Sequence, residues 1–334
     1  MEYVKYGASG LKVSRICLGA MTFYSRMDEA EAIDLVRRAY DKGINFIDTA
    51  DSYGNGTSEE FLSRALDGIR DQVVISTKVF ASSYARQRRP ADCSRRNIIN
   101  ALHASLRRLN TDYVDIYMCH HPDPLTSFEE TYSTLNDLVR QGKIRYLGMC
   151  NSYAWQVAHV IGLCGKYGWE PPIALQVAYN LIDRVMEIET RQMAEHLGLA
   201  LQAYGPQAGG LLTGKYKRGE ALPEGSRAAA SRQFAERLTD NVFDLLDEMT
   251  RVAAKHDITL GQLAVVWMLS RPGCIVPIIG GSRAEHLDPL FDCTDLEVDA
   301  QDLERLTQLT EQYRYMPWHN QPFDTAPSPG PNWL

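Results

Sequence analysis

The sequence predicts an α/β fold in which eight parallel strands close into a (β/α)8 TIM barrel. Short apolar segments alternate with longer segments of helical periodicity along most of the 334 residues. Eight segments are strand candidates, and most of them precede a helix, which is typical of parallel α/β folds. Polar side chains follow several of these strands, as expected where the strand–helix loops of a barrel converge.

Composition and charge narrow the class of protein. The chain is 45% hydrophobic and 23% charged, which are the proportions of a globular protein with a large core. Its net charge of −7 argues against general binding to nucleic acid or anionic membrane. No apolar run approaches the roughly 20 residues that cross a bilayer, and no secretion signal is visible. Seven cysteines without a Cys-x-x-Cys motif favour a reducing, cytoplasmic compartment.

The first third of the chain contains a hairpin and two strand–helix units. Residues 1–13 are predicted to form a β-hairpin that caps the barrel, and residues 16–18 form the first barrel strand. Asp28 is expected to cap the next helix. The second strand, 44–47, leads into Asp48 and a loop that carries Tyr53. We expect Thr57 or Ser58 to cap the helix that follows.

The strand–helix alternation continues to the end of the eighth strand. Further strands are predicted over 73–78, 113–120, 144–149, 174–177, 200–204 and 275–279, with helices over 94–109, 128–140, 155–164, 190–197, 242–255 and 260–270. A Gly/Ala-rich connection, 205–240, interrupts the rhythm. We expect one domain over 1–334, with the Pro- and Trp-containing tail 317–334 lying over the barrel mouth.

An open, doubly wound sheet is the alternative arrangement of the same elements. It is disfavoured because no Gly-x-Gly-x-x-Gly motif follows the first strand, where nucleotide-binding folds need close approach of the backbone to phosphate.

Four polar residues are expected to meet at one end of such a barrel. Asp48 and Tyr53 follow strand two, Lys78 ends strand three and His120 ends strand four. A phenol normally titrates near about 10, and we expect an adjacent ammonium to lower that pKa. The carboxylate can hold the lysine in place, and an imidazole can orient a reacting oxygen. Together the four residues would donate a proton to an oxygen that gains negative charge.

Each of these residues also has a structural interpretation. A buried Asp48–Lys78 pair is often only structural, and Tyr53 alone would be an ordinary loop tyrosine. The neighbouring His120 and His121 suggest a metal site, but consecutive strand residues face opposite ways. No metal is predicted for this reason.

Several spaced motifs resemble those of the aldo-keto reductase superfamily and occur in the same order. The resemblance extends along the chain to about residue 315. They are Ile47-Asp48-Thr49-Ala50-Asp51-Ser52-Tyr53-Gly54, Ser76-Thr77-Lys78, Asp115-Ile116-Tyr117-Met118-Cys119-His120, Ile144-Arg145-Tyr146-Leu147-Gly148, Gln176-Val177-Ala178-Tyr179-Asn180 and Gly210-Leu211-Leu212-Thr213-Gly214-Lys215-Tyr216. The resemblance implies an eight-stranded barrel that reduces an aldehyde or ketone with NADPH. It implies that Tyr53 is the general acid, supported by Lys78, Asp48 and His120.

The resemblance also implies where NADPH would bind. The residues implied near the nicotinamide and its ribose are Asp48, Gly19, Ala20, Met21, Cys150, Asn151, Gln176 and Tyr204. Those implied near the phosphates and the adenine are Gly205, Pro206, Gln207, Ala208, Gly209, Lys215, Arg227, Gly280, Ser282, Arg283 and His286, with Gly280, Ser282 and Arg283 opening a helix. Taken singly, these are turn, core or solvated residues.

Three departures from the family pattern affect this cofactor assignment. Cys150 and Gly205 stand where the family usually has Ser, and Cys is a much weaker hydrogen-bond donor. His286 replaces a usual Gln or Arg, and Pro289-Leu290 replaces a Glu-Asn pair that contacts adenine. The choice between NADPH and NADH therefore stays open at the adenine end.

The substrate and partners are less defined by the sequence. Five arginines, Arg86, Arg88, Arg89, Arg95 and Arg96, follow the third strand; they form either a solvated basic loop or a site for an anionic substrate. A nucleotide-sugar keto or 2,3-enoyl reductase, as in some relatives from antibiotic pathways, is therefore one alternative. Another is a cofactor-sensing regulatory subunit that resembles potassium-channel β subunits. The oligomeric state is not determined.

Overall fold

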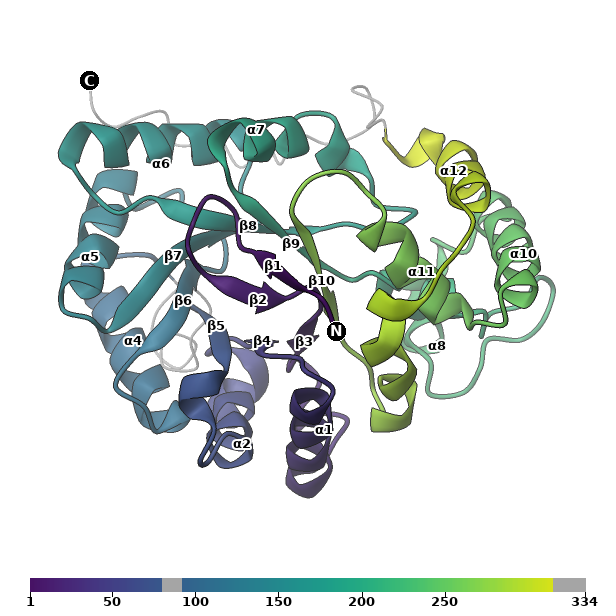
Figure 1. Ribbon diagram of the computed structural model, residues 1–334, viewed down its shortest axis with the longest axis horizontal. Coiled ribbons are helices and arrows are strands. Elements are labelled where there is room, and N and C mark those ends of the chain that lie inside the picture. The colour runs from purple at the N-terminus through teal and green to yellow at the C-terminus, as the bar shows by residue number, and fades with distance from the viewer. Residues whose placement is uncertain (80–91, 315–334) are drawn as a thin grey trace.

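A computed structural model describes residues 1–79 and 92–314. Eight parallel strands close into a barrel in the order β10-β3-β4-β5-β6-β7-β8-β9. Figure 1 shows these strands surrounded by the helices that connect them. The predicted TIM barrel is therefore confirmed, and the open-sheet alternative is excluded.

The elements follow the predicted order along the chain. The strands are β1 Tyr3–Lys5, β2 Lys12–Ser14, β3 Cys17–Gly19, β4 Phe46–Asp48, β5 Val74–Val79, β6 Val114–Cys119, β7 Ile144–Cys150, β8 Pro172–Ala178, β9 Ala200–Tyr204 and β10 Ile275–Ile279. The helices are α1 Glu29–Asp41, α2 Thr57–Ala65, α4 Arg95–Leu109, α5 Phe128–Arg140, α6 Ala154–Tyr167, α7 Thr190–Leu197, α8 Arg227–Ala230, α9 Arg232–Ala235, α10 Asp240–Lys255, α11 Leu260–Leu269 and α12 Ala300–Leu309.

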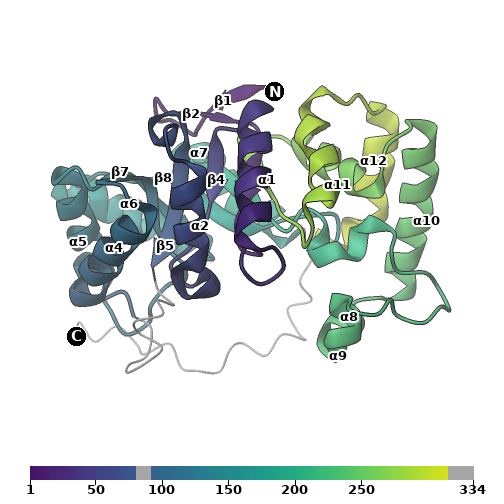
Figure 2. The same cartoon turned by 90° about the horizontal axis from the view of Figure 1, so that it is seen from below.

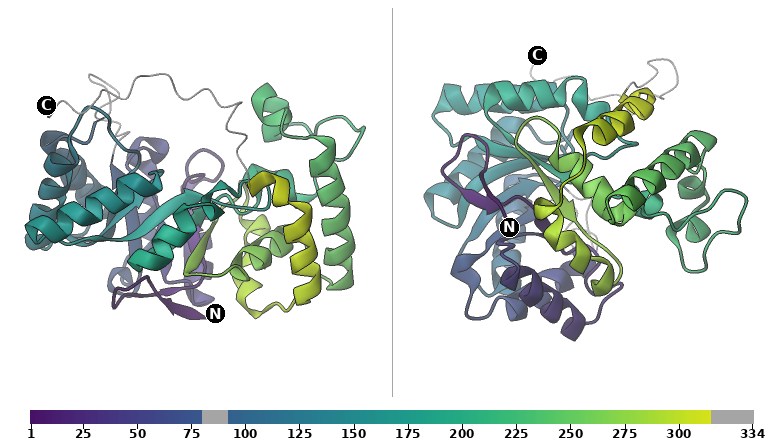
Figure 3. Two further views of the ribbon diagram at one scale, coloured as in Figure 1. Left: turned by 90° about the horizontal axis from the view of Figure 1, so that it is seen from above. Right: turned by 45° about the vertical axis from the view of Figure 1, so that its right-hand side comes forward.

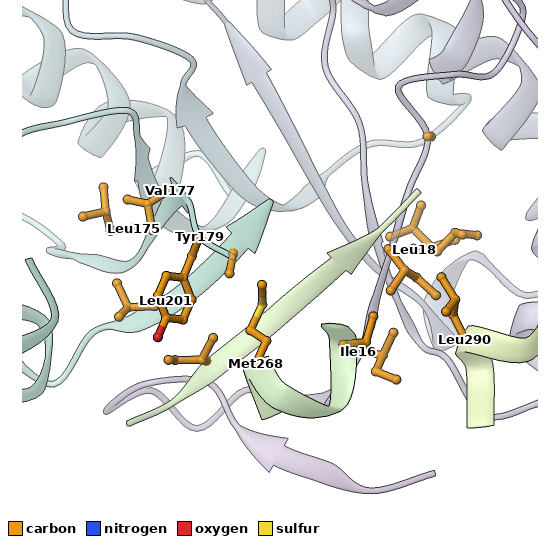
Figure 4. Close-up of a cluster of buried hydrophobic side chains, with 14 of the residues drawn as sticks. Ile16, Leu18, Leu175, Val177, Tyr179, Leu201, Met268 and Leu290 are labelled. Carbon is orange, nitrogen blue, oxygen red and sulfur yellow. The ribbon is translucent and has the colours of Figure 1, made fainter. Parts of the chain in front are cut away.

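Two layers of apolar side chains hold the barrel together. One layer fills the interior and includes Phe46, Ile116 and Met118. The larger layer lies between the strands and the surrounding helices, and Figure 4 shows part of it, with Leu175 and Leu201 among its members. The helices α10 and α12 pack against each other on one side of the barrel, as Figure 3 also shows.

The hairpin closes one end of the barrel, as predicted. β1 and β2 pair antiparallel, and Tyr6 in the turn packs edge-on against Phe46 with ring centroids 5.3 Å apart. The hydroxyl of Tyr6 donates a hydrogen bond to Gln202 Oε1 at 3.3 Å. Figure 2 shows the hairpin at one end and α8 and α9 beyond the other. The functional loops are therefore confined to the end opposite the hairpin.

Strand register creates a polar layer at that open end. Asp48 on β4 is paired with Ser76 on β5, and Gln176 on β8 is paired with Gln202 on β9. These four side chains are buried. The register therefore brings them to one level of the interior, where they can bond across the barrel.

Several local predictions need correction. The N-cap of α2 is Gly56, with φ 98°, and no side chain caps it. The hydroxyls of Thr57 and Ser58 instead bond the carbonyls of Gly54 and Ala20. The connection over 205–240 interrupts the strand–helix alternation as predicted, and it contains the short helices α8 and α9.

The segment after β10 also differs from its prediction. We predicted a helix opened by Gly280, Ser282 and Arg283, but two short 3-10 helices, Ala284–His286 and Asp288–Asp295, follow β10. Pro289 lies in the first turn of the second of these helices, and it has no backbone N–H to donate.

Some predictions fall outside the described residues. They concern Arg86, Arg88 and Arg89 and the tail 317–334, so the single domain over 1–334 and the cover over the barrel mouth stay predictions.

Candidate active site

A buried ion pair occupies the open end of the barrel. The ammonium of Lys78, at the end of β5, donates hydrogen bonds of 2.7 Å to Asp48 Oδ2 and to the carbonyl of Thr49. Lys78 has no exposed surface, and Asp48 is 3% exposed. Burial alone would lower the pKa of Lys78, but Asp48 and Tyr53 outweigh burial and raise it. Lys78 therefore stays charged at neutral pH.

The second oxygen of Asp48 is held by the polar layer. Asp48 Oδ1 accepts hydrogen bonds from Ser76 Oγ at 2.7 Å and from Gln176 Nε2 at 2.8 Å. The amide of Gln202 lies 3.5 Å from the same oxygen. These contacts fix the orientation of the carboxylate that holds Lys78.

Ser76 and Gln202 were not among the predicted site residues. Each lies two residues before a selected residue, Lys78 on β5 and Tyr204 on β9, so strand alternation would have placed each pair on the same face.

Tyr53 lies beside this pair on a tightly constrained loop. Its hydroxyl is 3.5 Å from Lys78 Nζ. The next three residues, Gly54, Asn55 and Gly56, all have positive φ, a conformation that favours Gly and Asn. A Cβ atom on Gly54 would collide with the ring of Tyr24. The three residues after Tyr53 therefore have a backbone conformation that few other residue types could adopt.

The net pKa shift of Tyr53 is opposite to our prediction. Burial raises the pKa of Tyr53, and Lys78 offsets only part of that effect. Lys78 still acts in the expected direction, but the prediction did not include the cost of burying a phenolate. The phenol is consequently protonated at neutral pH, as a proton donor must be.

His120 completes the group at the end of β6. Its ring meets that of Tyr53 edge-on with centroids 5.9 Å apart. Burial, the charge of Lys78 and the neighbouring His121 lower the pKa of His120 to about 3, so the ring is neutral at pH 7. His120 Nδ1 is buried without a hydrogen-bond partner among the described residues.

His120 and His121 point the same way, whereas strand alternation predicted that they face opposite ways. Their rings stack with centroids 5.0 Å apart and an interplanar angle of 11°. The reason is that β6 ends at Cys119, so both residues lie in the loop and escape strand alternation.

Residues predicted near the nicotinamide form a connected group on β7, β8 and β9. The hydroxyl of Tyr204 donates to Asn151 Oδ1 at 2.8 Å, and Asn151 Nδ2 donates to the carbonyl of His120 at 2.9 Å. Tyr204 is 37% exposed, so one side of the ring is open to solvent. The thiol of Cys150 lies 3.6 Å from Gln176 Oε1, and burial raises its pKa to about 12.

Gln176 is placed differently from Asn151. It is 2% exposed, and its amide nitrogen bonds Asp48. Gln176 therefore orients the Asp48 carboxylate, and its contact with a cofactor carboxamide stays a prediction.

Several residues predicted near the cofactor phosphates lie on one turn, next to the side chains of Lys215 and Arg227. Gly205, Ala208, Gly209 and Gly210 all have positive φ. A Cβ atom on Gly209 would lie 2.8 Å from Arg227 Nη1, and one on Gly210 would lie 2.6 Å from Lys215 Nζ. The N–H groups of Ala208 and Gly210 bond carbonyls within the turn, so Lys215 and Arg227 are the side chains that could pair with a phosphate. The donor set therefore fits a phosphate-bearing cofactor, with Pro206 and Gln207 inside the same turn.

The loops after β3 and β10 lie next to each other. Thr22 Oγ1 donates to the carbonyl of Gly281 at 2.6 Å, which links the segment Gly19, Ala20 and Met21 to the segment containing Gly280 and Ser282. Met21 is 57% exposed. These loops therefore lie at the same end of the barrel as Asp48, Tyr53, Lys78 and His120, which we call the tetrad.

The remaining predicted cations are less clearly placed. Arg283 bonds Glu285 at 3.4 Å and is exposed, and His286 ends the first 3-10 helix after β10. Arg95 and Arg96 are the first residues of α4, not loop residues, and Arg95 pairs with Asp137 on α5. The predicted anion site of five arginines stays a prediction, because Arg86, Arg88 and Arg89 lie outside the described residues.

The chain matches a known family along most of its length. The profile of the Aldo/keto reductase family covers residues 15–311. The chain belongs to the aldo/keto reductase family.

Named relatives cover nearly the whole chain. Aldo-keto reductase YhdN of Bacillus subtilis is 31% identical over 93% of this chain and 94% of its own length. Versiconal hemiacetal acetate reductase of Aspergillus parasiticus is 32% identical over 92% and 96%. A probable voltage-gated potassium channel subunit beta of Arabidopsis thaliana is 34% identical over 89% and 92%. This aldo/keto reductase thus has relatives named as enzymes and relatives named as channel subunits.

Membership of the family establishes the general chemistry. Aldo/keto reductases are oxidoreductases that use a nicotinamide cofactor. Within residues 1–79 and 92–314 of this aldo/keto reductase, no helix is both long and apolar enough to span a bilayer.

Proposed function

We propose that this protein reduces an aldehyde or ketone to an alcohol, with NADPH as the reductant. The observation that carries the proposal is the contact between the Tyr53 hydroxyl and Lys78, 3.5 Å apart, with Lys78 held by Asp48. Such a group can protonate an oxygen, and a carbonyl oxygen that receives a hydride needs a proton.

Each member of the tetrad has a distinct role in this proposal. Tyr53 donates its proton to the carbonyl oxygen, and Lys78 stabilises the phenolate that remains. Asp48 holds the ammonium charged and in place. Neutral His120 can hydrogen-bond the substrate oxygen, which orients the carbonyl. The bound cofactor supplies a hydride from its nicotinamide ring.

The cofactor is assigned from the two groups of residues described above. Asn151 and Tyr204 would hold the nicotinamide, since an aromatic face offers a planar contact. The turn Gly205–Gly209, with Lys215 and Arg227, would hold the phosphates. Arg227 offers a guanidinium for a 2′-phosphate, which favours NADPH over NADH. We place the protein in the cytoplasm, because all seven cysteines are free.

The proposal is tested by measuring NADPH oxidation with a panel of aldehydes and ketones. NADPH that carries deuterium at the transferable C4 position should deliver the label to the carbinol carbon of the product. Nucleotide-linked keto sugars belong in the panel, because their reduction would identify the anionic substrate class. Absence of NADPH oxidation with every carbonyl compound would contradict the proposal.

A regulatory function is the second candidate. It is favoured by the relatives named as probable potassium channel β subunits, which are as similar to this chain as its enzyme relatives are. On this alternative the protein binds NADPH but turns over no carbonyl compound, and it binds a channel. The same assay, combined with NADPH binding by fluorescence, separates the two functions.

A further inference from the structure

A carboxyl group behind the tetrad lacks the partners that a buried charge requires. Asp51 lies on the loop between Asp48 and Tyr53, and its backbone N–H donates to the carbonyl of Lys78 at 3.2 Å. Its side chain is 1% exposed, and no other side chain among the described residues hydrogen-bonds either oxygen. A buried, unpaired carboxylate is very costly, so such a group normally takes up a proton.

The neighbours of Asp51 already balance their charges without it. Lys78 on β5 is paired with Asp48. Arg108 on α4 donates from Nε to Glu59 Oε2 at 2.7 Å, and the other oxygen of Glu59, on α2, accepts from Thr77 at 2.7 Å. Two cations and two carboxylates are therefore matched, and an ionised Asp51 would be a third carboxylate without a cation of its own.

A second unpartnered group lies in the same region. Tyr117 on β6 has no exposed surface, and its hydroxyl makes no hydrogen bond among the described residues. Asp51 and Glu59 both raise the pKa of Tyr117, after burial itself, so this phenol is neutral and gives Asp51 no charge compensation. The groups that face Asp51 are therefore Glu59 from α2, Lys78 from β5, Arg108 from α4 and Tyr117 from β6.

We propose that Asp51 is a positioning residue that acts as a neutral carboxylic acid, and that loss of its proton displaces the loop that holds Tyr53 against Lys78. This inference rests on the proposed reductase activity of the same site. A buried carboxylate without a cation of its own is unfavourable, so an ionised Asp51 should move toward water, and its backbone N–H would then leave the carbonyl of Lys78. Carbonyl reduction should therefore fail when Asp51 ionises.

The pH at which this happens follows from the surroundings of the carboxyl group. Burial and the charge of Glu59 raise the pKa of Asp51 to about 8, although Arg108, Lys78 and the backbone N–H of Ser52 lower it in part. The group is therefore protonated at pH 7 and ionises in the mildly alkaline range.

The first test compares pH profiles of kcat/KM for the wild type and Asp51→Asn. We expect the wild type to lose activity with a midpoint near pH 8, and Asp51→Asn to keep its activity to a pH higher by at least about one unit. Glu60→Gln is the matched control, because Glu60 is exposed on α2 next to Glu59 and its neutralisation should leave the midpoint unchanged. Equal midpoints in wild type and Asp51→Asn would overturn the proposal.

The second test needs neither turnover nor a stable variant. Infrared spectra of the cofactor-free wild type should contain a protonated-carboxyl C=O band at pH 7 that disappears as the pH passes through about 8. Absence of this band at pH 7, or its persistence in folded Asp51→Asn, would overturn the assignment of Asp51. If the band behaves as expected but no carbonyl compound is reduced, the proposed function fails and the ionisation of Asp51 stands.

Discussion

The hydroxyl of Tyr53 lies 3.5 Å from the ammonium of Lys78, and that ammonium lies 2.7 Å from Asp48. The lysine is therefore bonded more closely to its counter-ion than to the phenol. This order suits a proton donor, because Lys78 remains charged while Tyr53 keeps its proton until a substrate oxygen needs it. Because the Asp48–Lys78 pair is buried, breaking it should also lower the stability of the barrel.

Removing the counter-ion of Lys78 should destabilise the fold. Asp48→Asn leaves a buried ammonium without a carboxylate, and we expect the free energy of unfolding to fall by about 3 kcal/mol. Urea denaturation measures this change. Glu195→Gln, which breaks the exposed pair with Arg191, is the control and should cost at most about 1 kcal/mol. Equal losses in the two variants would show that burial does not make the Asp48 pair special.

The turn after Tyr53 should not tolerate a side chain. Gly54→Ala forces a Cβ into the ring of Tyr24 at a φ of 59°, so we expect a loss of about 1–2 kcal/mol in stability together with a lower kcat. The control is Gly162→Ala on α6, where nothing lies within 4 Å of the added Cβ. That change should stabilise the protein by about 0.5–1 kcal/mol. A fully active and stable Gly54→Ala variant would contradict the described turn.

His120 should make the protein sensitive to acid. The pKa of His120 is about 3 in the folded state, whereas an unfolded histidine titrates near about 6.5. Between these values the unfolded chain binds one more proton, so stability falls as the pH drops, by about 1.4 kcal/mol per pH unit. His120→Gln should remove this contribution to the change of unfolding free energy with pH. The change is measured by urea denaturation between pH 6 and 4. The exposed His196→Gln is the control, and an unchanged slope in His120→Gln would refute the assignment.

Arg227, beside the Gly-rich turn, should make the protein prefer NADPH to NADH. Arg227→Ala removes the guanidinium that lies against Gly209, and we expect KM for NADPH to rise roughly tenfold, since one charge-assisted hydrogen bond is worth about 1.5–3 kcal/mol. KM for NADH should change much less. Arg232→Ala on α9 is the control, because Arg232 is fully exposed and pairs with Glu236. Equal effects on both cofactors would place Arg227 away from the 2′-phosphate.

The sequence was sufficient for the barrel and for the position of the tetrad. Apolar segments that end in Asp48, Lys78 and His120 mark strand ends, and parallel strands bring their carboxyl ends together. The cap at Asp28 was also predictable, because Glu31 follows three residues later, which is the pattern of a capping box. In the structure the side chain of Asp28 accepts a hydrogen bond from the backbone N–H of Glu31.

Features that depend on long-range contacts could not be predicted in this way. Strand register decides that Ser76 and Gln176 reach the same oxygen of Asp48, and a local pattern contains no register. The direction of the Tyr53 pKa shift depends on how deeply the ring is buried relative to its distance from Lys78. The stacking of His120 on His121 follows from a strand that ends one residue earlier than its hydrophobic pattern suggests.

The most direct test of the proton-donor role is the single substitution Tyr53→Phe. It removes the hydroxyl and keeps the ring against His120, so we expect kcat for carbonyl reduction to fall by about 10²–10⁴-fold while the Kd for NADPH stays within about twofold of wild type, a difference of less than 0.5 kcal/mol. Full turnover by Tyr53→Phe would contradict the account, because the proton would then come from another group.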